Sequence, residues 1–509
     1  MIRFFLTICM VFLSLITAGD AFCQPKKDTL VVCLGKAPPK SLDPAVSNTR
    51  QVLTLYHNWG DTLLYRDPVD GEIMPCLAES YRLLDNSGIL LSLRKGVTFH
   101  NGEPFNAGAV KFSVELLKKS DSRVSGYLAD IKDVIIVDDH TVRIDVVKPI
   151  PTLLQLLANV LFIYPPGYYH QVGKEGFGQH PVGTGPYQFV SRKSPLEIHF
   201  KAYNGYFGGP KGKAHIPKLK ILSIGETVPQ MEALISGKVD LIRSGCVNPE
   251  QAPFLKRSDQ VKILSTKSLR VYFLCMDAKG RSGETPFKDK KVRQAVNHAI
   301  NREGISKNAF NGFAVVSGSV ISPLHFGYEN HVVQYPYDPA KAGKLLAEAG
   351  YPKGFDIDFY AINNESAAES IVEDLKAVGI RVNAKWMMGK WDQMYQKFLA
   401  GEIPLAFLTW GSYSIFDAGA LMDHFFMADS KACYGTTPEI DRFLKQANNT
   451  QDREERKRLF SKAQKQIAEQ AFWVPICSVE VICAMQKDLR FQPAMDEIDR
   501  YFMASWPSN

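Results

Sequence analysis

The chain has 509 residues, 45% of them hydrophobic and 22% charged, which is the composition of a folded protein too long for one compact domain. Its formal net charge of +7 is spread along the sequence, and the REERKR run at 453–458 is typical of a solvated helix face. Because nucleic-acid-binding proteins gather their basic residues in dense patches, this distribution argues against nucleic acid as a partner.

The N-terminal segment is predicted to be a cleavable export signal. A basic residue precedes an apolar run too short to span a membrane, and the small residues Gly19 and Ala21 suit signal peptidase. We therefore expect residues 1–21 to be removed and the mature protein to be periplasmic, with no later membrane-spanning stretch. A lipid anchor on Cys23 is disfavoured, because Phe22 stands where a lipoprotein has a small residue.

The cysteines of the mature chain are scattered and form no CxxC pair for zinc or redox chemistry. Their mostly apolar neighbours predict small buried side chains. These cysteines are Cys23, Cys33, Cys76, Cys246, Cys275, Cys433, Cys477 and Cys483.

Short β-like runs alternate with helices along the mature chain. Strands are predicted at 30–35, 88–94, 219–224 and 271–276. These runs are rich in Val, Ile and Leu, as expected for buried strands.

Four later segments have the apolar periodicity of helices, and several carry stop or start signals. In one of them Asp338 can cap the helix, Pro339 fits its first position, and Gly350 suits a left-handed end. The helices are predicted at 289–300, 338–350, 365–379 and 390–401.

Two strands follow the last two of these helices, IRVNAKW (380–386) and LAFLTW (405–410). This alternation predicts an α/β fold with a partly parallel sheet. Ligands of such sheets bind outside the carboxyl ends of the strands. The stretch LTWGSYSIFDAG (408–419), which begins at such an end with Trp410, is therefore a candidate site.

No catalytic motif is found in the sequence. The GxSxG, HExxH and Walker patterns are missing, and GGPKGKA (208–214) lacks a correctly placed first glycine and the Ser/Thr. His298 and His424 are interpreted as polar helix or surface residues rather than metal ligands. We therefore expect neither an enzyme nor a protein with a metal or another cofactor.

Aromatic and small polar residues gather in one region of the sequence. This mixture suits a small-molecule cleft, but it also suits an aromatic-rich core, and the residues alone leave both open. The aromatic residues are Trp386, Trp391, Trp410, Tyr413 and Phe416, and the polar residues are Asn363, Asn364, Ser412 and Ser414.

A series of phrases, read in order, resembles one protein family. The phrases are LDPAVSN (42–48), PCLAESYRLLDNSGILLSLRKGVTFHNGEPFNAGAVKFSVE (75–115), PVGTGPYQF (181–189), ISGKVDLI (235–242), PFKDKKVRQAVNHAINRE (286–303), YDPAKAGKLLAEAGY (337–351) and LKAVGIRV (375–382). Together they resemble the periplasmic peptide/nickel-type solute-binding proteins of ABC importers, over about residues 30–480. LRKGVTFHNGEPF and GTGPY are specific to that family, whereas Ala109 departs from its usual acidic residue.

The resemblance implies a two-lobed periplasmic-binding-protein fold with an extra domain in the first lobe, and a monomer that meets a permease and ATPase at the inner membrane. Lobe 1 would comprise 22–74, 186–272 and 478–509, the inserted domain 75–185, and lobe 2 residues 273–477. The chain would cross between the lobes near 268–273 and 475–481, and these crossings would form a hinge. A ligand that touches both lobes would favour their closure.

The resemblance also bears on the ligand. Peptide-binding relatives place an Asp for the ligand's amine where this chain has Tyr413, and dipeptide-specific relatives place an Arg in a segment that here reads AINNESAAES (361–370), without Arg or Lys. The usual partners of both charged ends of a short peptide are therefore missing. We expect a peptide or peptide-like amphiphilic solute, and a compound without a free α-amine is one candidate. Asp417 could supply a displaced carboxylate, or it could simply cap a helix beginning at Ala418.

Three other functions stay open. In a binder of nickel or metallophore chelates, His424 would be a candidate contact. A periplasmic peptide-holding chaperone would also use a closing cleft. A secreted hydrolase would need a catalytic constellation, which the sequence does not show. The predicted ligand-binding residues are Trp410, Tyr413, Ser412, Asp417, Trp386, Asn363 and Asn364.

Overall fold

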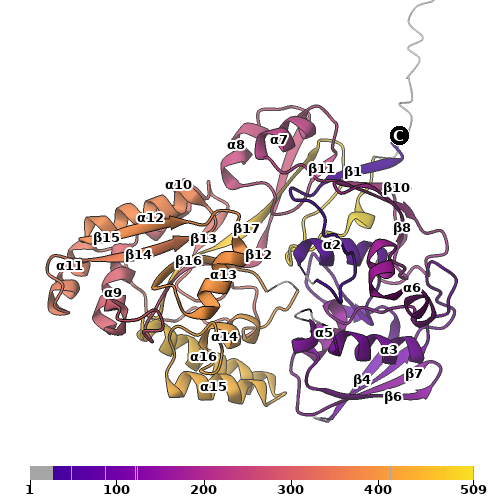
Figure 1. Cartoon of the computed structure of the whole chain (residues 1–509), viewed down its shortest axis with the longest axis horizontal. Coiled ribbons are helices and arrows are strands. Elements are labelled where there is room, and N and C mark those ends of the chain that lie inside the picture. The colour runs from indigo at the N-terminus through magenta and orange to yellow at the C-terminus, as the bar shows by residue number, and fades with distance from the viewer. Residues whose placement is uncertain are drawn as a thin grey trace, which may run out of the picture.

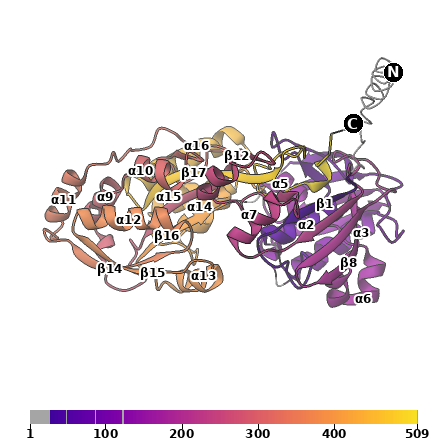
Figure 2. The same ribbon diagram turned by 90° about the horizontal axis from the view of Figure 1, so that it is seen from above.

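The protein has two lobes that lie side by side (Figures 1 and 2). Lobe 1 contains the N-terminal part of the chain, drawn in indigo and magenta, and lobe 2 contains the orange part. This arrangement confirms the predicted two-lobed α/β fold. The computed structural model describes residues 27–507 except Asn48, Asn86, Asp121, Arg123 and Tyr413.

One sheet runs through both lobes, with its strands in an order that differs from their order in the sequence. A short strand, β13 (Ala314–Val316), pairs with β17 beside this path. From lobe 2 to lobe 1 the path is β15 (Ile380–Trp386), β14 (Phe355–Ala361), β16 (Leu405–Trp410), β12 (Val261–Met276), β17 (Trp473–Gln486), β11 (Leu241–Ile242), β1 (Thr29–Cys33), β10 (Lys218–Leu222), β9 (Glu197–Ala202) and β8 (Tyr187–Ser194).

The long antiparallel strands β12 and β17 connect the lobes (Figure 2). They pair around Leu264 on the lobe 1 side and again around Leu274 on the lobe 2 side. Between these two ladders the register shifts, between Lys267 and Val271. The predicted crossing at 268–273 falls on this irregularity, where the backbone is released from regular pairing.

The sheet of lobe 2 is partly parallel, as the sequence predicted. β14 pairs in parallel with both β15 and β16, whereas β16 pairs antiparallel with β12. Trp410 is the last residue of β16, and Trp386 is the last residue of β15. Both tryptophans therefore lie at the carboxyl edge of this sheet.

The four helices predicted for lobe 2 are confirmed, and their termini follow the expected chemistry. The Asp338 carboxylate accepts a hydrogen bond from the Lys341 amide at 2.8 Å, and Gly350 has φ of 89°. The helices of this lobe are α9 (Lys290–Ala299), α10 (Arg302–Ala309), α11 (Pro339–Glu348), α12 (Glu365–Ala377), α13 (Trp391–Ala400), α14 (Gly419–Phe426), α15 (Pro438–Asn448) and α16 (Arg453–Glu469).

A separate four-stranded sheet lies at the lower edge of lobe 1 in Figure 1, within the segment predicted as an inserted domain. Its side chains share one hydrophobic core with the large sheet, because Leu91 and Leu219 belong to the same buried cluster. The sheet consists of β4 (Ala78–Leu84), β5 (Gly88–Leu93), β7 (Thr141–Val146) and β6 (Ile131–Asp138), and β2 (Leu64–Arg66) pairs with β3 (Ile73–Pro75) nearby. The helices of this half are α2 (Arg50–Trp59), α3 (Ala107–Lys118), α4 (Val124–Tyr127), α5 (Leu153–Asn159), α6 (Pro166–Gln179), α7 (Thr227–Ile235) and α8 (Ala252–Leu255).

The cysteine prediction is confirmed for most of the described cysteines, which are buried with free thiols. Cys246 differs, because it is only half-buried. Cys23 and the predicted signal, 1–21, lie outside the described residues. Within the described part of the chain, no helix combines the length and the apolar character needed to cross a bilayer.

Candidate functional site

Trp410 forms part of an aromatic wall at the carboxyl edge of lobe 2. Its half-buried ring stacks on His424 of α14, with centroids 4.8 Å apart and an angle of 15° between the planes. On α13, Trp391 stacks on Tyr395 at 5.3 Å and 14°, and both rings also lie near Trp410. The tryptophan therefore packs against other aromatic side chains of this lobe and also lies at the edge of its sheet. The sequence left the choice between core and cleft open, and Trp410 has features of both.

His424 is an integral part of this wall and not a separate polar residue. Its Nε2 atom lies 2.8 Å from the Tyr395 hydroxyl, and its ring lies against both the Tyr395 and the Trp410 rings, which also contact each other. His424 lies in helix α14 and is half-buried, as interpreted from the sequence, and its ring in addition packs against the tryptophan.

Ser412 is held by a histidine that sequence reasoning missed. The buried His325 lies with Nε2 2.7 Å from the Ser412 hydroxyl and with Nδ1 3.1 Å from the Ser322 carbonyl oxygen. The carbonyl can only accept, so Nδ1 carries the proton and the Ser412 hydroxyl donates to Nε2. Burial lowers the pKa of His325 to about 4, which keeps the ring neutral near neutral pH.

Asp417 does not reach toward a ligand. Its carboxylate accepts two hydrogen bonds from the Arg456 guanidinium, at 2.8 and 2.9 Å, and both side chains are buried. The same carboxylate accepts the Gly419 amide at 3.0 Å, at the start of α14. Of the two roles that the sequence left open for Asp417, these contacts favour the one at the start of the helix over the ligand contact. The 453–458 run lies on helix α16 and is largely solvated, as expected, except that Arg456 is buried.

The side chain of Asn364 also makes its hydrogen bonds within the protein. It adopts φ of 52°, its Oδ1 accepts the Ala367 amide at 3.0 Å, and its amide group donates to the Ala309 carbonyl. It therefore caps α12 and ties that helix to α10. Its neighbour Asn363 is half-buried just after β14.

Trp386 is 41% exposed at the end of β15. It lies two strands away from Trp410, roughly 10 Å across the sheet, and is level with Phe407, three residues before Trp410 along β16. Trp386 thus extends the edge, but its ring is not part of the stack around Trp410. Tyr413 lies outside the described residues.

The residues after Trp410 cross from lobe 2 to lobe 1, and we call 414–416 the bridging segment. The Ser414 hydroxyl donates to Asp496 at 2.7 Å, and the Phe416 amide donates to the Gln155 side chain at 2.6 Å. The Phe416 ring lies 4.5 Å from the Arg66 guanidinium. Ile415, between them, is buried in the core cluster of lobe 1, so the segment is inserted into the opposite lobe.

We call the boundary between the two lobes the seam. A charged cluster lies where the seam meets the crossing strands β12 and β17. Arg270 of β12 donates to Glu497 through Nε at 2.7 Å and through Nη2 at 2.8 Å, and Arg50 at the start of α2 donates to the same carboxylate. The Arg270 guanidinium also contacts Thr409, next to Trp410. Sequence reasoning found the crossing strand but missed these residues, because they are more than 200 positions apart and no local pattern connects them.

The model of the bacterial extracellular solute-binding proteins, family 5 Middle, matches residues 72–432. The chain belongs to this family. The family predicted from the sequence phrases is therefore confirmed.

Individual relatives of this solute-binding protein cover nearly the whole chain. The glutathione-binding protein GsiB of Pectobacterium atrosepticum is 29% identical and covers 88% of each chain. The heme-binding protein A of Haemophilus influenzae is 28% identical and covers 90% of this chain and 89% of its own. The solved structure of DppA from Helicobacter pylori, in complex with the peptide STSA, matches with a TM-score of 0.80 and 25% identity, over 94% of this chain and 98% of the other.

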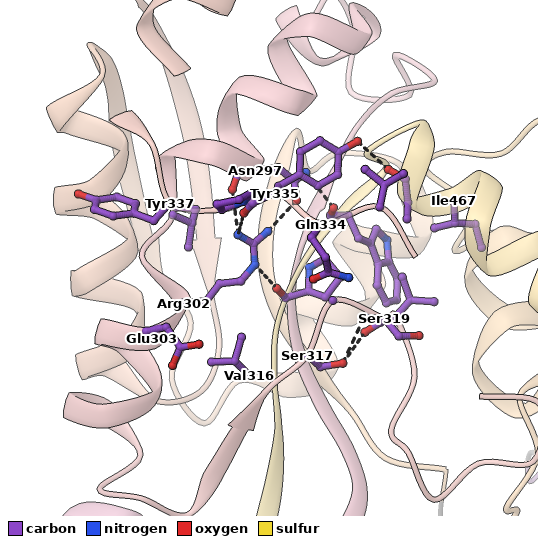
Figure 3. Close-up of a pocket in the computed structure, with 18 of the residues that line it drawn as sticks. Asn297, Arg302, Glu303, Val316, Ser317, Ser319, Gln334, Tyr335, Tyr337 and Ile467 are labelled. Carbon is purple, nitrogen blue, oxygen red and sulfur yellow. Dashed lines mark hydrogen bonds between the residues drawn. The ribbon is translucent and has the colours of Figure 1, made fainter. Parts of the chain in front are cut away.

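A pocket of about 200 Å³ lies inside lobe 2 of this solute-binding protein, between α10, β13 and α16 (Figure 3). Arg302 points into its wall and donates to the carbonyl oxygens of Pro475 and Tyr335 and to the Asn297 side chain. Because these bonds tie parts of one lobe together, the pocket belongs to the packing of lobe 2. It is lined by none of the predicted site residues.

Proposed function

We propose that the protein is the substrate-binding component of an ABC importer, which captures a peptide or peptide-like solute between its lobes and delivers it to a membrane permease. The bridging segment is the observation that carries this proposal. It links the aromatic wall to lobe 1 within a few residues, so a solute that lies on Trp410 also lies against lobe 1. Such a solute contacts both lobes and stabilises their closed arrangement.

The relatives support the chemical class of the solute. GsiB is a glutathione-binding protein, and the structure of DppA contains a peptide. An aromatic wall next to hydrogen-bonding groups suits a ligand with both apolar side chains and a polar backbone.

We further propose that the protein is exported by its N-terminal segment to the periplasm, acts as a monomer, and releases its solute chemically unchanged. Its partners would be a permease and an ATPase at the inner membrane.

Native mass spectrometry of freshly purified protein tests this proposal. We expect a complex with one small molecule, which is lost on denaturation and whose fragments contain amide bonds. Protein that carries no such mass, and that also binds no member of a peptide library in calorimetry, would contradict the proposed function.

A further inference from the structure

Two guanidinium groups share a single carboxylate at the seam between the lobes. Burial by itself would raise the pKa of Glu497, but Arg270 and Arg50 outweigh burial and hold it at about 2. Glu497 is therefore charged under all ordinary conditions, and it neutralises only one of the two arginines. The neighbouring Arg243 and Asp499 belong to the same cluster, because their charges act on Glu497 and on Arg50. Three arginines therefore face two carboxylates and one positive charge remains in excess, with side chains that are 21% exposed for Arg50 and 16% exposed for Arg270.

Two features of the backbone place these arginines at the seam, a register shift in β12 and two glycines that lie close to the guanidinium groups. Arg270 lies in the register shift of β12, and its amide donates to the Ser268 hydroxyl instead of the sheet ladder. A side chain at Gly411 would start 3.0 Å from Arg270 Nη2, and one at Gly245 would start 2.8 Å from Arg50 Nη1. Both guanidiniums therefore lie directly against backbone, one of them beside Trp410.

Arg66 is a further cation of this seam, and the charges of Asp496 and Glu72 act on it without a direct ion pair among the described residues. It is 4% exposed, it contacts Phe416 of the bridging segment, and its Nε has no hydrogen-bond partner. Its other donors reach the Gly71 carbonyl and the Gln155 amide oxygen, so no carboxylate of the described residues pairs with it. Burying a guanidinium without an opposite charge is costly, and the cost falls when an anion binds.

The carboxylates of the seam are already engaged. Asp496 accepts two hydrogen bonds from Arg500 at 2.8 Å, and Asp417 is bound to Arg456. Glu497 is held by its own arginines. Asp499, a fourth acid here, is fully buried, accepts the Ser244 amide and lies near Arg243 and Arg50. Thus each of these acids has a cationic neighbour, and an ammonium group of a ligand would have to displace an arginine to reach one.

We propose that the seam formed by Arg50, Arg270 and Arg66 is an anion-recognition site, and that the solute is a carboxylate-bearing peptide-like compound bound without need of a free amine. This inference rests on the proposed function and names its substrate class. Arg50 is the arginine best placed to bind the ligand carboxylate. Among the described residues only its Nη1 donates a hydrogen bond, to Glu497.

Calorimetry with three probes tests this inference. N-acetyl-Ala-Glu-Ala carries carboxylates and no amine, Ala-Gln-Ala amide carries an amine and no carboxylate, and trialanine carries one of each. We expect the acetylated acid to bind at least about tenfold more tightly than the amide. Its affinity should also fall as salt is added, since salt screens the attraction.

The Arg50→Gln variant links this preference to the seam. Glu497 keeps its two-point contact with Arg270, so the variant should fold and melt near the wild-type temperature. We expect about a tenfold or larger loss of affinity for the acetylated acid and little change for the amide. The matched control is Arg381→Gln, which removes an exposed arginine paired with Asp356 and should change neither affinity.

The outcomes separate this inference from the proposed function. If the amide binds as tightly as the acetylated acid, or if Arg50→Gln affects all probes equally, the anion site is overturned while peptide binding stands. If none of the probes binds, the charge of the copurified compound decides, and a neutral or cationic compound overturns the inference. A protein with neither a copurified compound nor any peptide ligand overturns the proposed function itself.

Discussion

At the scale of single residues, Trp410 combines packing with recognition. One face of its ring is covered by His424, and Phe425 meets it edge-on, so the tryptophan is rigidly held at the end of β16. A side chain that is already immobilised loses little conformational entropy when a ligand stacks on it. This explains why one tryptophan could be interpreted from the sequence either as core or as cleft.

We predict that Trp410→Ala weakens solute binding by about tenfold or more, because the stacking surface is lost. The proteins are unfolded to remove the bound solute and then refolded. Calorimetric titration with the copurified solute measures the change in affinity. The control is Trp386→Ala, at the exposed end of β15, for which we expect a smaller loss. Unchanged affinity in Trp410→Ala would contradict the site assignment.

Asp417 illustrates how a carboxylate near a site can serve the fold instead. We predict that Asp417→Asn lowers the free energy of unfolding by about 3–5 kcal/mol, because Arg456 would be left buried and uncompensated. Urea denaturation measures the loss. Asp356→Asn, which breaks an exposed ion pair with Arg381, should lower the free energy of unfolding far less, because solvent screens that pair. Similar values for the two variants would show that the buried pair has no special role.

At the scale of elements, the bridging segment limits how the lobes move. Its neighbours on either side, Trp410 and Asp417, are fixed in lobe 2 by stacking and by the Arg456 ion pair. The segment itself inserts Ile415 and Phe416 into lobe 1. Separating the lobes therefore requires these side chains to leave lobe 1, whereas the strands β12 and β17 need only bend.

We predict that Phe416→Ala shifts the ligand-free protein toward a more open arrangement, because the variant loses the contact with Arg66 and apolar burial. Small-angle X-ray scattering should show a larger radius of gyration than in the wild type. Phe254→Ala, at an exposed phenylalanine of α8, is the control and should scatter like the wild type. Identical scattering for all three proteins would mean that the bridging segment does not hold the lobes together.

At the scale of the whole molecule, one buried cluster joins two of the predicted domains. The four-stranded sheet and much of lobe 1 share this cluster, a smaller one lies under α7 and α8, and the large clusters of lobe 2 are separate from both. A shared core transmits the loss of one part to the other. The inserted segment should therefore unfold together with lobe 1.

We predict two calorimetric transitions for the ligand-free protein, not three. Leu91→Ala in the four-stranded sheet and Leu219→Ala in the large sheet should both destabilise the same transition, each by about 2–5 kcal/mol, since both residues are fully buried in one cluster. The transition of lobe 2 should stay in place. A third transition that moves only with Leu91→Ala would show that the inserted segment folds independently.

The sequence by itself determined the elements whose causes are local. Asp338 and Gly350 mark the ends of α11, and the apolar runs ending in Trp386 and Trp410 mark strands of a parallel sheet. The family could also be predicted, because its phrases are continuous in the chain. Capping, periodicity and continuous phrases all act within a few residues, so they can be read without the fold.

Only the tertiary structure decided which polar groups are available to a solute. Asp417 was a plausible ligand contact until Arg456, 39 positions away, was found to bind it. No local sequence pattern marks Glu497, and only the structure shows that Arg50 and Arg270 both donate hydrogen bonds to it. Whether a charge is free or satisfied depends on partners brought together across the chain, because electrostatic pairing follows distance in space and not position in the sequence.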